Sequence, residues 1–465
     1  MKKTFIFLIL LVSQALPAQQ PAWPELIGEN KPWTRWWWPG SIVTKPGLTA
    51  AMEKYRDAGL GGLEIAVIYG VKGQEDKFIN YLSPRWMDMF THVLAEGERL
   101  GLGIDLANAS GWPFGGPWVK PADACKNINY RIWTLSGGDS LKEKIEFIQQ
   151  PLVRPVGERP DITRLKDPIA ENDNLQLYAL DQIRFEKPLP LIALMAYSDS
   201  GRIADLTGNV TPEGKLVWTA PPGKWTLYGV FQGWHGKMVE RAGPGGEGDV
   251  IDHFSGPAID NYLKHFDSIF KDYDIRSLRG YFNDSYEVDD ASGQADWTND
   301  LFSEFILRRG YDLRDHLPAL FQKDETEKNE RVLSDYRQTI SDLILEKFTT
   351  RWTEWAHRQG KTVLPVLRQG PRRPRRRRPG GLPRGTSAGG GETAGEGGRA
   401  RGNRAPLPGG RRIRRSARRR PSARVRAVGR CGQTDFRRGR ARRRGHRTDG
   451  SVRRFRHQAA QGRRG

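Results

Sequence analysis

Cysteine is almost absent from this sequence of 465 residues, in which only Cys125 and Cys431 occur. Two cysteines do not make a disulfide framework, and they exclude a zinc site built on cysteine. His235 and His253 have no partner at metal-ligand spacing, which favours core or surface roles for both. No GxGxxG turn follows the first expected strand, which is evidence against a dinucleotide-binding fold.

Long hydrophobic runs are also missing beyond the N-terminus, so no later segment is expected to cross a membrane. At the N-terminus two lysines precede a short apolar run, and small residues follow as far as Ala18. This pattern predicts a secretory signal peptide over residues 1–18 and a secreted or periplasmic protein. No cysteine follows the apolar run, so a lipoprotein anchor is not indicated, and we expect no membrane anchor.

Lysine, tryptophan, tyrosine and methionine all disappear after Lys361. Residues 362–465 contain 33 arginines and four acidic residues, whereas the rest of the chain has 42 basic and 50 acidic residues. The net charge of +21 therefore comes wholly from this tail, and the body of the chain is mildly acidic. An Arg/Gly/Pro-rich segment cannot bury a core, which predicts disorder.

Two explanations of the tail compete. It is either a basic arm that binds nucleic acid or an out-of-frame translation of GC-rich DNA. The switch comes directly after a helix, at the start of an apparent strand, inside an unfinished domain. This position favours the out-of-frame explanation.

Short apolar strands alternate with helices over residues 19–124, which indicates parallel pairing. Residues 61–70 are typical of a buried parallel strand, and residues 83–100 of a helix with Ser83 as its N-cap. Over residues 125–250 the pattern changes to short alternating strands separated by turns, which predicts an inserted antiparallel β domain.

The strand–helix alternation resumes over residues 251–361 and stops at the apparent strand that begins there. The predicted fold class is therefore α/β. We expect an incomplete (β/α)8 barrel with an inserted antiparallel β domain and a disordered tail over residues 362–465. A doubly wound open sheet is the alternative.

Aromatic and amide side chains gather where the parallel strands of the barrel are expected to end. Trp36, Trp37 and Trp38 lie at the end of the first strand, and Asn108 and Trp112 lie at the end of the third. Catalytic groups of (β/α)8 barrels come from such strand ends. Indole faces and amides suit a sugar ring, which predicts a carbohydrate site. The alternative is that one or more of the three neighbouring tryptophans belong to the core.

Carboxylates complete the candidate site. Glu287 and Asp284 lie at the end of a later strand, and Glu64 lies within the second strand. Glycosidic cleavage needs one carboxyl as acid and a second as base or nucleophile, and Glu287 is our candidate for one of them. Alternatively, Asp284 and Glu287 cap a helix or hold a salt bridge, and Glu64 and Asp105 pair with arginines.

Six strings of residues together resemble glycoside hydrolase family 106, the α-L-rhamnosidases. They are TRWWWPG (34–40), GLGGLEIAVIYGVKG (59–73), GWPFGGPWV (111–119), ERAGPGGEGDVIDHFS (240–255), FNDSYEV (282–288) and RRGYD (308–312). The resemblance implies a (β/α)8 barrel with appended β domains, inverting cleavage of terminal α-L-rhamnosyl residues, and a glycan substrate that contains rhamnose. It matches Glu287 to one of two catalytic glutamates, and it implies a calcium ion near the sugar. Asp284, Asp289 and Asp290 are oxygen ligands of the type that calcium takes.

In this family the second catalytic glutamate lies beyond the fifth strand, where this sequence has its arginine-rich tail. We therefore expect a glycosidase by family whose chain, as written, is inactive. The alternatives are a carbohydrate-binding fragment without catalysis, and a basic protein that binds nucleic acid through residues 368–464. The predicted secretion argues against nucleic acid as a partner.

Overall fold

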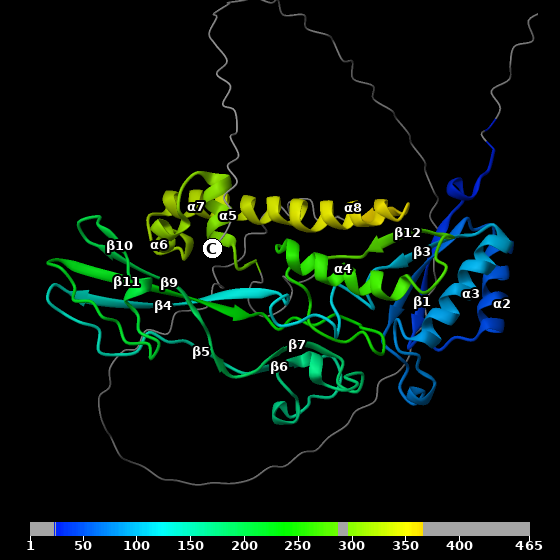
Figure 1. The fold of residues 1–465 in the computed structure, drawn as a ribbon, viewed down its shortest axis with the longest axis horizontal. Helices are drawn as coiled ribbons and strands as arrows, with labels where there is room; N and C mark the ends of the chain where they lie inside the picture. Colours follow the sequence, from blue (N-terminus) through cyan, green and yellow to red (C-terminus); the bar gives the residue numbers. More distant parts are fainter. Residues whose placement is uncertain (1–22, 24, 287–295, 366–465) are drawn as a thin grey trace, which may run out of the picture. The chain divides into compact units, whose positions relative to one another are not determined.

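A five-stranded parallel sheet is built from strands that lie far apart in the sequence (Figure 1). The computed structural model describes residues 23, 25–286 and 296–365. The strands lie in the order β1 (Trp33–Pro39), β2 (Gly62–Ile68), β3 (Gly103–Ala107), β12 (Leu278–Asn283) and β13 (Thr362–Pro365). Parallel register places Arg35 beside Glu64, and Glu64 beside Asp105. The alternation of strands and helices thus produced the parallel pairing that it predicted.

One face of this sheet is covered by helices. They are α2 (Lys45–Asp57), α3 (Pro84–Leu100), α4 (Gly256–Phe270) and α8 (Arg351–Arg358). Their apolar residues form a single buried cluster with alternate strand residues, among them Trp38, Leu63, Ile65, Leu106 and Tyr281. Because side chains alternate along a strand, the remaining strand residues lie on the opposite face, which we call the open face.

The boundaries of α3 follow the predicted capping residues. The Ser83 hydroxyl accepts a hydrogen bond from the Trp86 amide, and Pro84 is the first helical residue. Gly101 ends the helix with φ of 66°, a left-handed conformation that glycine adopts without steric penalty. The predicted N-cap and C-terminal glycine are both confirmed.

A second sheet is antiparallel and lies in the chain between β3 and β12. Its order is β10 (Ile203–Asp205), β9 (Leu191–Ser198), β11 (Lys224–Trp234) and β4 (Lys126–Ser136). Two short antiparallel pairs accompany it: β5 (Ile148–Gln149) with β8 (Lys187–Pro188), and β6 (Leu152–Pro155) with β7 (Leu180–Arg184). The antiparallel character expected for this stretch is therefore present.

Three further helices pack against that antiparallel sheet. They are α5 (Leu301–Arg309), α6 (Leu317–Leu320) and α7 (Thr326–Leu343). Side chains of β4, β9 and β11, such as Tyr130 and Tyr228, share one apolar cluster with Phe305, Leu317 and Tyr336 from the helices. The chain then continues from α7 through a π-helical segment (Ile344–Thr350) into α8, which packs on the parallel sheet. One long helical stretch thus contributes to both cores.

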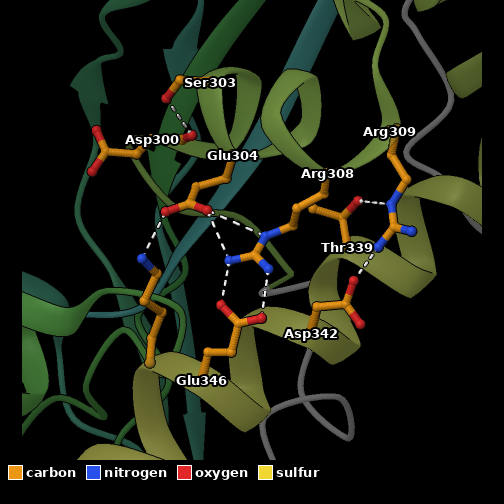
Figure 2. A network of polar contacts seen from close by, with 9 residues as sticks. Asp300, Ser303, Glu304, Arg308, Arg309, Thr339, Asp342 and Glu346 are labelled. Carbon is orange, nitrogen blue, oxygen red and sulfur yellow. Dashed lines mark hydrogen bonds and ion pairs between the residues drawn. The ribbon is translucent and has the colours of Figure 1, made fainter. Parts of the chain in front are cut away.

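A network of charged groups joins α5 to this long helical stretch (Figure 2). The Arg308 guanidinium donates to Glu346 at 2.7 Å and to Glu304 at 3.0 Å, and the Lys347 ammonium lies 2.8 Å from Glu304. Arg308 and Glu304 are mostly buried, with 13% and 16% of their side chains exposed. Partly buried pairs in a network contribute more to stability than isolated surface pairs.

The expected barrel is not closed within residues 25–286 and 296–365. The parallel sheet has β1 at one edge and β13 at the other, and each edge strand has one parallel neighbour. The prediction that the tail is disordered from Thr362 is wrong over its first four residues, since Thr362–Pro365 form β13 and pair with β12, and residues 366–465 lie outside the described part. No helix in the described part of the chain is both long and apolar enough to cross a bilayer.

Candidate active site

The open face of the parallel sheet forms the floor of a solvent-open hollow of about 620 Å³. Charged residues of neighbouring strands line it, namely Arg35, Glu64, Asp105 and Arg279, together with Glu29, Trp33, Thr34 and Leu364. Toward the carboxyl ends of the strands the same face becomes apolar, where Ala66, Ala107, Phe282 and Leu364 pack together. The open face is thus charged nearer the start of the strands and apolar toward their carboxyl ends.

Arg35 links a carboxylate of β2 to the carboxylate that directly follows β12. Its Nε donates to Glu64 Oε1 at 2.6 Å, and its Nη1 donates to Asp284 Oδ2 at 2.8 Å. The guanidinium also lies 4.5 Å from the centre of the Phe282 ring. The three side chains are only partly exposed, between 17% and 27%. The structure therefore brings together Glu64 and Asp284, which are 220 residues apart in the sequence.

A second ion pair lies beside the first. The Arg279 guanidinium donates to both oxygens of Asp105, and it lies 3.9 Å above the Trp33 ring. Burial raises the pKa of Asp105, and the hydrogen bond and charge of Arg279 oppose that rise. The sequence left open whether Glu64 and Asp105 pair with arginines, and both do.

Burial also raises the pKa of Glu64. The charge and hydrogen bond of Arg35 lower it, and repulsion from Asp105 and Asp284 adds to the rise. Three carboxylates and two guanidinium groups thus share this part of the open face. A carboxyl group with a raised pKa holds its proton more readily than a free one, as an acid catalyst requires.

The three consecutive tryptophans point to opposite faces of the sheet. Trp37 is 41% exposed on the open face, where the Arg35 guanidinium lies 5.1 Å from its ring centre. Trp36 and Trp38 pack edge to face on the helix side, with ring centres 5.7 Å apart, and Trp38 is only 1% exposed. Strand alternation therefore divides the predicted set: Trp37 is exposed on the open face, whereas Trp36 and Trp38 pack on the helix side and Trp38 is a core residue.

Trp112 extends the aromatic surface that Trp37 begins. The two ring centres are 6.3 Å apart. The backbone at Trp112 pairs with Glu240 through two hydrogen bonds, of 3.2 Å and 2.7 Å. The preceding Gly111 has φ of 101°, and a Cβ there would lie 2.1 Å from the Glu240 carbonyl oxygen, so only glycine fits. The glycines of the GWPFGGPW string thus set the position of Trp112.

Asn108 has a different position from the one predicted. It is fully buried, and its side-chain oxygen accepts a hydrogen bond from Trp352 Nε1 at 3.0 Å. Its backbone carbonyl accepts a hydrogen bond from the Tyr262 hydroxyl at 2.6 Å. Both partners come from helices that cover the sheet, so in this structure Asn108 joins β3 to α4 and α8 instead of facing the hollow.

Glu287, the predicted catalytic carboxylate, lies outside the described residues. The described chain stops one residue earlier, at Tyr286, whose ring centre lies 4.9 Å from that of His253. His253 is buried, and burial lowers its pKa to about 3, so it is neutral at physiological pH. This histidine is therefore a core residue, as its isolation in the sequence indicated.

The described residues do not by themselves fit a calcium ion. No group of three histidine, cysteine or acidic side chains suitable for a metal occurs among them. Of the three aspartates considered, Asp289 and Asp290 lie outside the described part, and Asp284 is bonded to Arg35. Calcium is bound by six to eight oxygen ligands, which this part of the chain does not gather.

Three residues that contact the predicted ones were not themselves predicted from the sequence. Arg35 bonds Glu64 and Asp284, the Arg241 guanidinium lies 5.7 Å from the Trp112 ring centre, and the Tyr69 hydroxyl accepts a hydrogen bond from Arg241. All three lie inside the strings that identified the family. The signal for Arg35 was its spacing, since residues 35 and 37 of a strand share one face. Arg241 follows the residue that pairs with Trp112, but that long-range pairing has no local signature in the sequence.

Comparisons with known proteins agree with this architecture. Residues 26–159 and 182–364 match the glycoside hydrolase family 106 profile, which is described as alpha-L-rhamnosidase. The match covers more than half of the chain, so the chain belongs to this family.

A protein of Formosa agariphila named "Putative beta-glucuronidase" is 29% identical over 342 residues. That alignment covers 70% of this chain and 28% of the relative. The solved structure of a rhamnosidase from Novosphingobium sp. PP1Y superimposes with a TM-score of 0.52 at 20% identity. This superposition covers 73% of this chain and 46% of the rhamnosidase. The present chain thus spans less than half the length of either protein.

Proposed function

We propose that this member of glycoside hydrolase family 106 holds a glycan with a terminal α-L-rhamnosyl residue on its open face. The observation that carries the proposal is the position of Arg35, which bonds Glu64 and Asp284 beside the exposed Trp37 ring. A sugar needs an aromatic surface for its C–H face and hydrogen-bond acceptors for its hydroxyl groups. Trp37 and Trp112 offer the aromatic surface, and the carboxylates of Glu64 and Asp284 offer the acceptors.

The proposed reaction is hydrolysis with inversion. Glu287, three residues after Asp284, would protonate the departing oxygen, and a second carboxylate would activate water on the opposite side of the sugar. Inversion requires the two carboxyl groups to lie roughly 6.5–9.5 Å apart. The described residues supply no assigned partner for Glu287, and residues 366–465 contain only four acids in arginine-rich surroundings. We therefore propose that this chain by itself binds the glycan without cleaving it.

Three further expectations belong to this proposal. The parallel sheet would be part of a (β/α)8 barrel, which is supported by the helices that cover one face and the charged residues on the other. The protein would be secreted or periplasmic through residues 1–18. Calcium would require ligands from the segment that contains Asp289 and Asp290, and no step above depends on it.

Isothermal titration calorimetry of the full chain with methyl α-L-rhamnopyranoside tests the binding. We expect saturable binding that Trp37→Ala weakens at least tenfold, because part of the aromatic surface is lost. Trp23→Ala is the matched control, since Trp23 is 94% exposed and takes no part in the site. Equal loss in both variants, or no binding to the parent chain, would refute the proposal.

Hydrolysis is measured in the same preparation with p-nitrophenyl α-L-rhamnopyranoside and p-nitrophenyl β-D-glucuronide. We expect binding of the rhamnoside and no release of p-nitrophenol from either compound. Release from the rhamnoside that Glu287→Gln abolishes would show that the chain contains both carboxylates. Release from the glucuronide alone would favour the activity in the relative's name and would refute the rhamnoside proposal.

A further inference from the structure

We infer that Arg241 recognises the carboxylate of a uronic acid next to the bound rhamnosyl residue, so that the site selects anionic glycans. The inference rests on the proposed function, and it names the substrate class of the same site. It is carried by the contacts of Arg241, by the conformation of its backbone and by its position next to the aromatic surface.

Arg241 is exposed and is held by aromatic side chains. Its Nη1 donates to the Tyr69 hydroxyl at 3.1 Å, and its guanidinium lies 5.7 Å from the Tyr69 ring centre and 5.7 Å from the Trp112 ring centre. Within residues 25–286 and 296–365 no carboxylate pairs with it. By contrast, Arg35 and Arg279, the other arginines of the site, are both paired.

The backbone at Arg241 has an unusual conformation and is held by hydrogen bonds on both sides. Arg241 has φ of 54°, in the left-handed region that favours glycine. Its carbonyl accepts a hydrogen bond from the Tyr69 amide at 2.9 Å, and the preceding Glu240 pairs with Trp112. A large charged residue in this conformation, fixed from both sides, is placed in advance for a ligand and loses little freedom on binding.

The Arg241 guanidinium adjoins the aromatic surface that Trp37 and Trp112 form. Trp112 lies between Arg241 and Trp37, and Trp37 lies in turn beside Arg35 and its two carboxylates. A rhamnosyl ring on Trp37 would therefore leave its neighbouring sugar over Trp112, within reach of Arg241. The planar fork of a guanidinium matches the two oxygens of a carboxylate.

The acidic groups nearby already have partners, so they do not compete for Arg241. Glu240 is bonded to Lys237, and Glu247 accepts a hydrogen bond from Gln176 at 2.9 Å. Glu64 and Asp284 are bonded to Arg35. An anionic substituent beside Trp112 would therefore meet a cation that lacks a carboxylate partner. Because Arg241 is exposed, its contribution should be modest and should weaken with salt.

Calorimetry with three disaccharides tests this inference. The probes are α-L-rhamnosyl-(1→4)-D-glucuronate, its carboxyl-reduced counterpart with glucose, and the 6-sulfate ester of that counterpart. For the parent chain we expect the glucuronate to bind roughly tenfold more tightly than the neutral probe in low salt. Arg241→Gln should abolish the preference for the glucuronate over the neutral probe, whereas Arg241→Lys should keep part of it. Tyr69→Phe, which keeps the ring, should reduce it only slightly.

The outcomes separate this inference from the proposed function. Equal binding of the charged and neutral probes to the parent chain, or an unchanged preference in a folded Arg241→Gln variant, would overturn the role of Arg241 alone. Tighter binding of the sulfate ester than of the glucuronate would overturn the assignment to a carboxylate. Binding of none of the three probes would overturn the proposed function, and the inference with it.

Discussion

The two faces of the parallel sheet are built from the same five strands but differ in the chemistry of their side chains. On the helix side the strand residues, such as Trp38 and Ile65, are apolar and buried. On the open face the corresponding residues of the same strands, such as Arg35 and Glu64, are charged and paired. A single string, TRWWWPG, therefore supplies both a core residue and a residue proposed to bind sugar at adjacent positions. Because neighbouring residues of a strand lie on opposite faces of the sheet, the face on which a residue lies indicates its role better than its sequence neighbours do.

The largest expected effect concerns the helix side. Trp38→Ala removes an indole that is 1% exposed and packs against Trp36 and Trp86. We expect a loss of about 4 kcal/mol in the free energy of unfolding, because a cavity replaces the ring. Urea denaturation followed by circular dichroism measures it. Trp37→Ala on the open face is the control and should lose less than about 1 kcal/mol. Similar losses in the two variants would contradict the division between the faces.

The next prediction concerns Asn108, which the structure moves from the predicted site to the helix side. Asn108→Ala would leave the buried Trp352 Nε1–H without its acceptor. We expect a loss of about 3 kcal/mol, since a buried donor is left unpaired and a small cavity is added. Thermal unfolding measures it, and sugar binding below the unfolding temperature should not change. Weakened binding in the folded variant would return Asn108 to the site.

Arg35→Met tests the open face, where paired charged residues occupy the positions that apolar residues occupy on the helix side. The variant keeps the length of the side chain but leaves Glu64 and Asp284 partly buried beside each other without their shared cation. We expect a loss of about 2 kcal/mol at pH 7 and a smaller one at pH 4, where the carboxyl groups take up protons. Arg35→Lys should recover part of it. An identical unfolding midpoint for the parent and Arg35→Met at pH 7 would contradict the prediction.

Much of the fold followed from local rules. The caps of α3 and the parallel strands were predictable because glycine, proline and serine act on the backbone next to them. The strand–helix alternation was expected to resume at residue 251, but α4 begins at Gly256, because Val250 and Ile251 form β-bridges with Gly115 and Ala124. These partners are distant in sequence, so a local pattern does not reveal them.

The candidate site was predictable by residue type more than by geometry. Glu64, Asp284, Trp37 and Trp112 were expected, and the structure gathers them around Arg35. The direction of each tryptophan was left open, because two adjacent strand residues point to opposite faces and the sequence does not say which face is covered. Pairing across more than 100 residues, as between Trp112 and Glu240, was also inaccessible.

The smallest expected effect compares two carboxylates whose pKa values are shifted in opposite directions. Burial raises the pKa of Glu64 on the open face above its usual 4.5, against the opposing effect of Arg35. In the helical network of Figure 2, burial would raise the pKa of Glu304 as well, but Lys347 and Arg308 outweigh burial and lower it. The folded state therefore favours the protonated form of Glu64 and the ionised form of Glu304.

The signs of the two pH effects follow by linkage. The raised pKa of Glu64 means that stability falls as pH rises from about 4.5 through the folded value, so Glu64→Gln should gain stability relative to the parent over that window. The lowered pKa of Glu304 contributes stability above about 4.5 that disappears as pH falls through the folded value. Glu304→Gln should therefore be less stable than the parent at pH 7, and the difference should shrink toward pH 3.

Each difference should be on the order of 1 kcal/mol, because both groups are partly buried and paired. Thermal unfolding of the parent and the two variants at pH 3, 5 and 7 measures them. The two substitutions are chemically identical, so any general effect of Glu→Gln cancels in the comparison. Differences of the same sign at pH 7 would mean that Arg35 outweighs burial at Glu64. The ion pairs of the open face would then stabilise the fold in the same way as those of the helical network. The two regions would differ only in how their residues pack.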